Sequence, residues 1–140
     1  MLYNINPAVW GQSFWDVFYY IVIAYPDNPT LSDKMYVRNF FDATQYILPC
    51  ENCRTHFSEN LKKYPMTEQV MSSKYELLNW LVGINNEVNS RIGKQSVNAD
   101  QMYAKYTAPK NKKIYWKSHM TIVLLVLLIL LIVFYMKNRN

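Results

Sequence analysis

The longest uncharged apolar run of the chain lies near its C-terminus and restricts what the whole sequence can fold into. The 17 residues from Met120 to Met136 carry no charged side chain. At about 1.5 Å rise per residue, a helix of this length nearly crosses a ~30 Å hydrocarbon core, and the aromatic and basic residues 115–117 can extend it. A soluble fold would have to cover such a helix on every side. The run therefore predicts a transmembrane helix over residues 118–136.

Charge changes along the chain near the same place. Residues 1–104 carry eight Lys or Arg against ten Asp or Glu, a balance of 8 − 10 = −2, whereas residues 105–140 carry seven Lys or Arg and no acid. Five lysines in residues 105–117 outnumber Lys137 and Arg139 beyond the apolar run. The positive-inside rule then places the folded part on the cytoplasmic side. The basic segment favours a membrane surface over nucleic acid as its neighbour.

These patterns predict four segments. They are a globular domain over residues 1–107, a basic linker over 108–117, the transmembrane helix over 118–136 and a short tail over 137–140. The N-terminus has no basic stretch before an apolar one, so we expect no secretory signal. The expected protein is single-pass and tail-anchored, because so little chain follows the helix.

Both cysteines of the chain stand in one local pair, Cys50-Glu51-Asn52-Cys53. A C-x-x-C pair at a helix start brings the two sulfurs within bonding reach, and the helix N-terminus favours a thiolate at the first cysteine. Three interpretations compete: a redox disulfide, half of a metal site and two ordinary buried thiols. A structural zinc site needs four Cys or His, and only His56 and His119 could join the pair. His119 directly precedes the apolar run that begins at Met120, so the count of ligands falls short. We therefore favour redox chemistry and expect no metal site.

Turn residues between Pro7 and Tyr106 divide the globular part into helical lengths. Two of the helices start at capping-box patterns, Thr30 with Asp33 and Ser73 with Glu76. The predicted helices cover residues 10–24, 30–47, 50–64 and 73–92, with a short fifth over 98–105. The expected fold class is all-α: a four-helix bundle plus a short fifth helix, followed by a single C-terminal transmembrane helix.

Three asparagines lie inside the predicted fourth helix, where each costs several tenths of a kcal/mol relative to alanine. Asn85 and Asn89 share a face, as do Asn86 and Asn89, and Lys94 lies one turn further on. One interpretation is an exposed polar face. The other is a row of amides and one cation that lines a ligand with phosphates and hydrogen-bonding ring edges.

Taken together, three blocks of the sequence resemble the Erv/ALR family of FAD-dependent sulfhydryl oxidases, including the short forms encoded by large DNA viruses. The blocks are Trp10-Gly11-x-x-x-Trp15, Cys50-x-x-Cys53 followed by His56-Phe57, and Asn86-Glu87-Val88-Asn89-x-x-Ile92-Gly93-Lys94 with Trp80 upstream. The match covers most of residues 8–105. The chain departs from the family pattern at Tyr19 and Asn85, where histidines are usual.

The resemblance implies a helical bundle that binds FAD without a covalent bond. Cys50 would be the exposed cysteine that a substrate thiolate attacks, and Cys53 the cysteine beside the flavin. Two electrons would pass from the reduced pair to FAD and on to oxygen, giving hydrogen peroxide. The implied cofactor-binding residues are Trp10, Gly11, Trp15, Tyr19, Trp80, Asn85, Asn86, Asn89 and Lys94.

The partners expected on this basis are a thiol-containing substrate protein such as a thioredoxin-like carrier, oxygen and a membrane. The membrane would be one facing a host cytoplasm, or a virion membrane if the chain is viral. A homodimer through the first two helices is permitted by their apolar faces, and nucleic acid is not an expected partner. Two alternatives remain: a tail-anchored adaptor whose C-x-x-C is incidental or joins an intermolecular metal site, and a flavin-free thiol-disulfide carrier.

Overall fold

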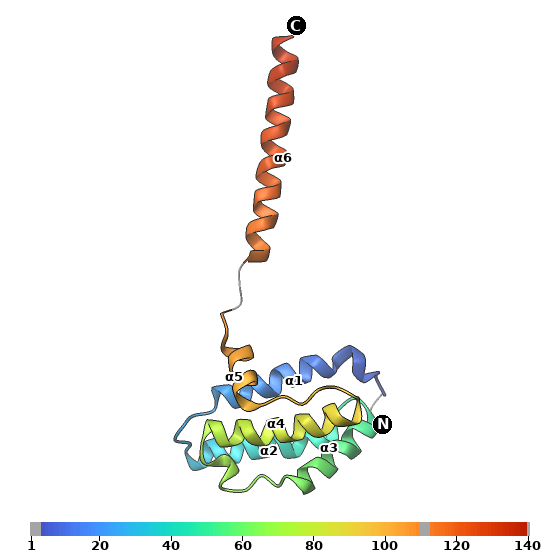
Figure 1. The fold of residues 1–140 in the computed structure, drawn as a ribbon, viewed down its shortest axis with the longest axis vertical. Coiled ribbons are helices and arrows are strands. Elements are labelled where there is room, and N and C mark those ends of the chain that lie inside the picture. The colour runs from blue at the N-terminus through green and yellow to red at the C-terminus, as the bar shows by residue number, and fades with distance from the viewer. Residues whose placement is uncertain (1–3, 110–112, 140) are drawn as a thin grey trace. The chain divides into compact units, whose positions relative to one another are not determined.

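The computed structural model describes residues 4–109 and 113–139, and every regular element within these ranges is helical (Figure 1). The elements are α1 (Pro7–Ala24), α2 (Leu31–Ile47), α3 (Glu51–Lys63), a single 3₁₀ turn (Val70–Ser72), α4 (Lys74–Arg91), α5 (Ala99–Thr107) and α6 (Lys113–Asn138). The all-α fold class predicted from the sequence is confirmed. Two compact units separate along the chain, Met1–Thr107 and Ala108–Asn140.

In the first unit, the helices pack in a bundle. α1 contacts α4, α2 contacts α3, and α3 also contacts α4. The short helix α5 packs against both α1 and α4. Segments far apart in the sequence, the start and the end of this unit, therefore lie side by side (Figure 1).

Aromatic rings form the centre of this bundle. Phe18 of α1 is 3% exposed, and its ring lies within about 6 Å, centroid to centroid, of rings on α1, α2 and α3. On α2, Phe41 also meets Trp80 of α4 edge to face at 4.9 Å. Such pairs add about 0.5–1.5 kcal/mol beyond the area that they bury. The aromatic cluster thus holds all four long helices together.

Helix starts follow local signals in the sequence. Thr30 and Asp33 form the complete capping box predicted for α2, and the Ser73 hydroxyl accepts the Glu76 N–H at the start of α4. α1 begins at Pro7, three residues before the predicted start at Trp10, and its N-cap is Asn6. Proline suits the first helical position because its missing N–H would have no partner there.

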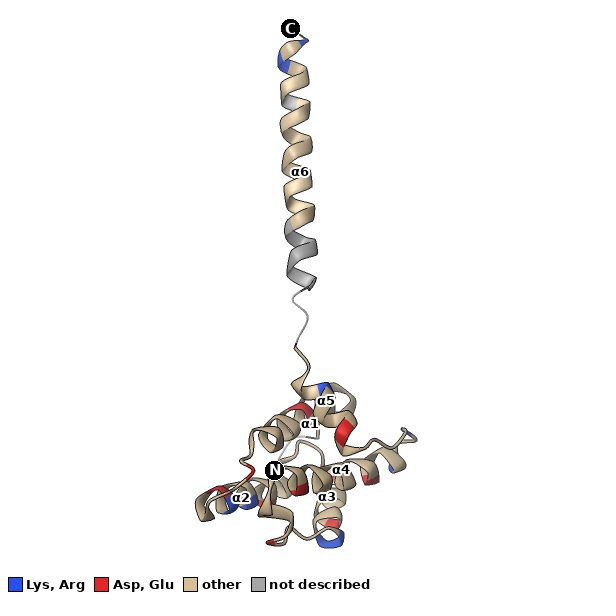
Figure 2. Cartoon of the chain, turned by 60° about the vertical axis from the view of Figure 1, so that its left-hand side comes forward, with Lys and Arg blue, Asp and Glu red and all other residues tan. Residues whose placement is uncertain are grey.

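The second unit contains α6, a helix of 26 residues. Its window Met120–Asn138 has a mean hydropathy of 2.8 and is long and apolar enough to cross a membrane. Between residues 120 and 136 the chain has no charged residue (Figure 2). At about 1.5 Å per residue, the 26 residues give a helix of roughly 39 Å. α6 is therefore a candidate membrane span.

Candidate functional site

Cys50 and Cys53 are joined by a disulfide at the start of α3, with their Cα atoms 5.1 Å apart. Only Leu48 and Pro49 separate the end of α2 from Cys50, which is the N-cap of α3. The Cys50 Sγ accepts a hydrogen bond from the Cys53 backbone N–H at 3.2 Å. Both sulfurs thus lie within the first turn of the helix, where the partial positive charge of the N–H groups favours thiolates.

Neighbouring segments fix the backbone around the disulfide. The Arg54 guanidinium donates to the Leu48 carbonyl at 2.6 Å. From the N-terminal side, the Ile5 N–H donates to the Pro49 carbonyl at 2.7 Å, and the Glu51 N–H donates to the Asn4 Oδ1 at 2.9 Å. The loop that carries Cys50 is held on both sides.

The expectation that Cys50 is the exposed cysteine is wrong for this structure. Cys50 is only 7% exposed, whereas Cys53 is half-buried. Asn4 and Ile5 bond the backbone immediately before and after Cys50, so the N-terminal segment lies beside this cysteine. Sequence spacing gave no signal of this contact, which joins residues more than forty positions apart.

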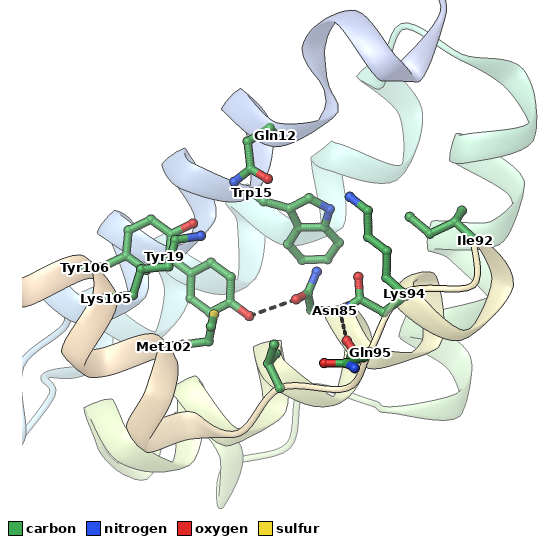
Figure 3. A pocket seen from close by; sticks show the side chains of 12 residues that line it. Gln12, Trp15, Tyr19, Asn85, Ile92, Lys94, Gln95, Met102, Lys105 and Tyr106 are labelled. Atoms are coloured by element: carbon green, nitrogen blue, oxygen red, sulfur yellow. Dashed lines mark hydrogen bonds between the residues drawn. The ribbon is translucent and has the colours of Figure 1, made fainter.

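A cavity of about 380 Å³ lies between α1, α4 and α5 (Figure 3). α1 and α4 contribute one side of it, and the segment after α4 together with α5 contributes the rest. The lining residues are Gln12, Trp15, Tyr19, Asn85, Asn89, Ile92, Lys94, Gln95, Val97, Met102, Lys105 and Tyr106.

Tyr19 and Asn85 form a buried pair in the wall of this cavity. The Tyr19 hydroxyl donates to the Asn85 Oδ1 at 3.2 Å, so the other side of the Asn85 amide faces the Trp15 ring (Figure 3). Tyr106 stacks on Tyr19 at 4.8 Å, and its hydroxyl donates to Asp16 at 2.7 Å. Burial raises the pKa of both Tyr19 and Tyr106. Both hydroxyls therefore remain protonated donors at any physiological pH.

The end of α4 turns the chain back along the cavity. Gly93 has a φ of 69°, a left-handed conformation that glycine adopts without steric cost. The Lys94 N–H donates to the Asn89 carbonyl at 2.8 Å, and the Gly93 N–H donates to the Ser90 carbonyl at 3.3 Å. These two bonds are the Schellman pattern of a helix end. They place Lys94 at the mouth of the cavity.

Side chains of two asparagines then hold this returning segment. Asn86 donates to the Val97 carbonyl and accepts the Val97 N–H, both at 2.9 Å. Asn89 donates to the Gln95 carbonyl at 3.2 Å. The asparagines inside α4 therefore offset their poor helix propensity with specific hydrogen bonds, which excludes the interpretation of a merely exposed polar face.

Charge in the cavity has one sign. Among the lining residues that the structure describes, there are two lysines, Lys94 and Lys105, and no Asp or Glu. Trp15 offers an aromatic face, and Asn85 and Asn89 offer amides. Such a surface suits a ligand with negative charge, a flat ring and polar ring edges.

The structure brings together five of the predicted cofactor-binding residues, and we find the other four elsewhere. Trp15, Tyr19, Asn85, Asn89 and Lys94 line the cavity; Trp10, Gly11, Trp80 and Asn86 are not in its lining, and neither are the two cysteines.

Each of the residues outside the lining has its own surroundings. Trp10 packs on Phe14 and donates its indole N–H to the Ile5 carbonyl. Trp80 is buried in the core, with its indole N–H on the Tyr64 carbonyl. A Cβ added at Gly11 would meet no described atom within 4 Å, so packing within the described chain does not require glycine there.

Sequence reasoning missed the part of the lining that comes from α5. Met102 and Tyr106 lie four residues apart and therefore share one face of that helix. This spacing, together with an aromatic residue in a short helix, was the sequence signal that could have identified the two residues as part of the lining. Gln12 and Gln95 carried no comparable signal.

Known proteins resemble this chain both in sequence and in fold. The sequence model of the Erv1/Alr family matches residues 12–108. The probable FAD-linked sulfhydryl oxidase R368 of Acanthamoeba polyphaga mimivirus is 36% identical over 114 residues, covering 79% of this chain and 80% of that protein. The putative FAD-linked sulfhydryl oxidase 347L of Invertebrate iridescent virus 6 is 32% identical over 95 residues, covering 65% and 86%. The crystal structure of the yeast Erv1 core has the same fold, with a TM-score of 0.69 at 20% identity, covering 77% of this chain and 89% of that one.

Proposed function

The chain belongs to the Erv1/Alr family, and we propose on that premise that Cys50 and Cys53 are the redox pair of an FAD-linked sulfhydryl oxidase. The protein is a thiol oxidase, and its substrates carry thiols. The observation that carries the residue assignment is the disulfide at the N-terminus of α3, formed by the only cysteines of the sequence.

The proposed step at the disulfide is thiol-disulfide exchange. A substrate thiolate forms a bond to the Cys50 Sγ as the Cys50–Cys53 bond breaks, and Cys53 leaves as a thiolate. A second substrate thiol then displaces Cys50, so the substrate keeps a disulfide and the enzyme pair is reduced by two electrons. Both departing sulfurs lie in the first turn of α3, whose N–H groups stabilise thiolates.

The chemistry of the cavity fits part of FAD. Its volume of about 380 Å³ is at the lower end of the roughly 300–1,000 Å³ typical of small-molecule sites, which is room for one end of a dinucleotide. The residues that would hold the cofactor there are Trp15, Tyr19, Asn85, Asn89, Lys94 and Lys105. Bound FAD supplies the two-electron acceptor for the reduced cysteine pair, with oxygen as the proposed final acceptor and hydrogen peroxide as the product.

The remaining features support a membrane-bound enzyme that takes electrons directly from its substrate. Within these 140 residues no second C-x-x-C is present to relay them.

We propose that α6 crosses a membrane with the oxidase domain on the cytoplasmic side, supported by the excess of lysines in residues 105–117. The exposed apolar side chains Val17, Leu31 and Met35 of α1 and α2 support a homodimer through these helices.

Purification of the full chain in detergent tests the proposal. We expect a yellow protein whose flavin colour bleaches when a dithiol is added without oxygen. Cys50→Ser and Cys53→Ser should each abolish oxygen uptake, while the Cys50→Ser protein keeps its flavin. Asn52→Ser changes an exposed residue between the cysteines and should keep full turnover. Oxygen uptake by either cysteine variant at the wild-type rate would contradict the assignment.

A further inference from the structure

The three residues before α1 form a short segment beside the disulfide, which we call the N-terminal strap: Asn4, Ile5 and Asn6. Its Ile5 N–H donates to the Pro49 carbonyl at 2.7 Å. Its Asn4 Oδ1 accepts the Glu51 N–H at 2.9 Å. A third bond comes from α1, where the Trp10 indole N–H donates to the Ile5 carbonyl at 3.1 Å.

The two groups that the strap occupies flank Cys50 on one side of its backbone. Cys50 is extended, with φ −158° and ψ 122°. In an extended chain, the carbonyl before a residue and the N–H after it point in the same direction. The Pro49 carbonyl and the Glu51 N–H therefore form a short edge that can pair with another extended chain. We call this the cysteine edge.

The reactive Cys50 is buried beside the strap. Cys50 is 7% exposed, and the strap is bonded on both sides of it. A substrate segment that pairs with the cysteine edge needs the Pro49 carbonyl and the Glu51 N–H, which the strap occupies, so the strap has to leave. The strap is suited to leaving, because Asn4 and Asn6 are exposed and Ile5 is 48% exposed. Hydrogen bonds, rather than apolar burial, hold it in place.

We propose that the N-terminal strap is an internal substitute for substrate at the cysteine edge. An extended, cysteine-bearing segment of the substrate protein displaces the strap and takes over its hydrogen bonds to the Pro49 carbonyl and the Glu51 N–H. The strap makes the first of these bonds with its main chain and the second with the Asn4 side chain. An extended substrate would supply a main-chain N–H and a main-chain carbonyl, a general mode of peptide recognition that needs no particular side chains. The proposal rests on the redox role of Cys50 and Cys53, and it adds the way in which their substrate binds.

Competition between strap and substrate has a kinetic signature. When only a fraction of the protein is in the binding-competent state, the apparent dissociation constant equals the intrinsic one divided by that fraction, while the rate at saturation is unchanged. A typical net hydrogen bond shifts such an equilibrium by about fivefold. Weakening the strap by one bond should therefore lower the KM for a peptide substrate by about fivefold and leave the limiting rate as it is.

Single-residue variants of the full chain in detergent test this signature. Ile5→Pro removes the N–H that bonds Pro49, and Asn4→Ala removes the acceptor that bonds Glu51. Ile5→Ala is the matched control, because it keeps the backbone N–H. The measured quantity is the initial rate at which a short unstructured peptide with two cysteines becomes a peptide disulfide by exchange with the Cys50–Cys53 disulfide, quenched by alkylation and quantified by mass spectrometry. Unchanged KM values in both Ile5→Pro and Asn4→Ala would overturn the proposal.

Hydrogen exchange distinguishes a peptide that takes over the strap's place at the cysteine edge from a strap that simply detaches. The probe is the same peptide with serine in place of cysteine, added to the wild-type chain. We expect the Ile5 amide to exchange faster and the Glu51 amide to stay protected, because the peptide replaces the strap as its partner. Exchange that rises at both amides, or at neither, would refute the shared edge. Neither readout uses flavin, so a colourless protein would contradict the oxidase assignment without affecting this test.

Discussion

Asn86 separates two explanations for the asparagines of α4, and its replacement by alanine tests them most sharply. The structure gives Asn86 the task of holding the segment after α4 through two hydrogen bonds to Val97, both at 2.9 Å. It does not line the cavity, whereas Asn85 and Asn89 do. Asn86→Ala should therefore lower the stability of the domain directly. It should affect cofactor binding only indirectly, through the loosened segment after α4.

The expected magnitude follows from those two bonds. At about 1 kcal/mol of net stability each, their loss lowers the free energy of unfolding by about 2 kcal/mol. Alanine is the better helix former by several tenths of a kcal/mol, so the net loss is about 1.5 kcal/mol. For a domain of about 100 residues this corresponds to a fall of roughly 6–12 °C in Tm.

Thermal unfolding of the flavin-free full chain in detergent, followed by near-ultraviolet circular dichroism, measures this loss. Ser90→Ala is the matched control, since Ser90 is an exposed residue of the same helix and should shift the free energy of unfolding by less than about 0.5 kcal/mol. A Tm for Asn86→Ala equal to that of Ser90→Ala would show that the Val97 bonds do not stabilise the domain. The reasoning about α4 would then be refuted.

Three further predictions concern the cavity and the membrane helix. Lys94→Met should weaken FAD binding by about tenfold without changing the stability of the flavin-free protein, because this exposed cation lines the cavity; unchanged affinity in a flavin titration would remove it from the site. Removing residues 108–140 should leave a flavin-loaded oxidase that no longer sediments with lipid vesicles, since every lining residue lies before Ala108; loss of flavin would contradict this. Burial raises the pKa of Tyr19 above its ordinary 10.0, so the stability that the protonated hydroxyl contributes is complete below pH 10 and is lost as the pH rises through the raised pKa. Tyr19→Phe should therefore make the alkaline decline in the free energy of unfolding shallower. An identical decline in the variant would exclude Tyr19 as its cause.

Local signals in the sequence were sufficient for the helices and insufficient for the site. Caps such as Thr30 and Ser73 act within a few residues, so they can be recognised without knowing the fold. The contact between Tyr19 and Asn85 joins residues 66 positions apart, and that between Asp16 and Tyr106 joins residues 90 apart. Tertiary packing decides such contacts.

The row of asparagines illustrates the same limit within a single helix. Spacing alone groups Asn86 with Asn85 and Asn89, because all three lie within about one turn. Their tasks differ because the chain reverses at Gly93 and runs back past only part of the helix surface. Asn86 faces the returning backbone at Val97, and Asn85 faces the cavity. A sequence pattern shows which residues share a surface, but the returning segment decides what each of them contacts.

The two departures from the family pattern, Tyr19 and Asn85, become one feature in the structure because each is the hydrogen-bond partner of the other. Tyr19 is 1% exposed, and a buried hydroxyl left without a partner costs about 1–3 kcal/mol. Replacing Asn85 leaves the Tyr19 hydroxyl without this acceptor, and replacing Tyr19 leaves the buried Asn85 Oδ1 without this donor, so the two positions depend on each other. Neither side chain changes its charge near neutral pH, whereas histidine does. This wall of the cavity therefore keeps the same hydrogen bond and the same charge across the pH range in which a histidine pair would titrate.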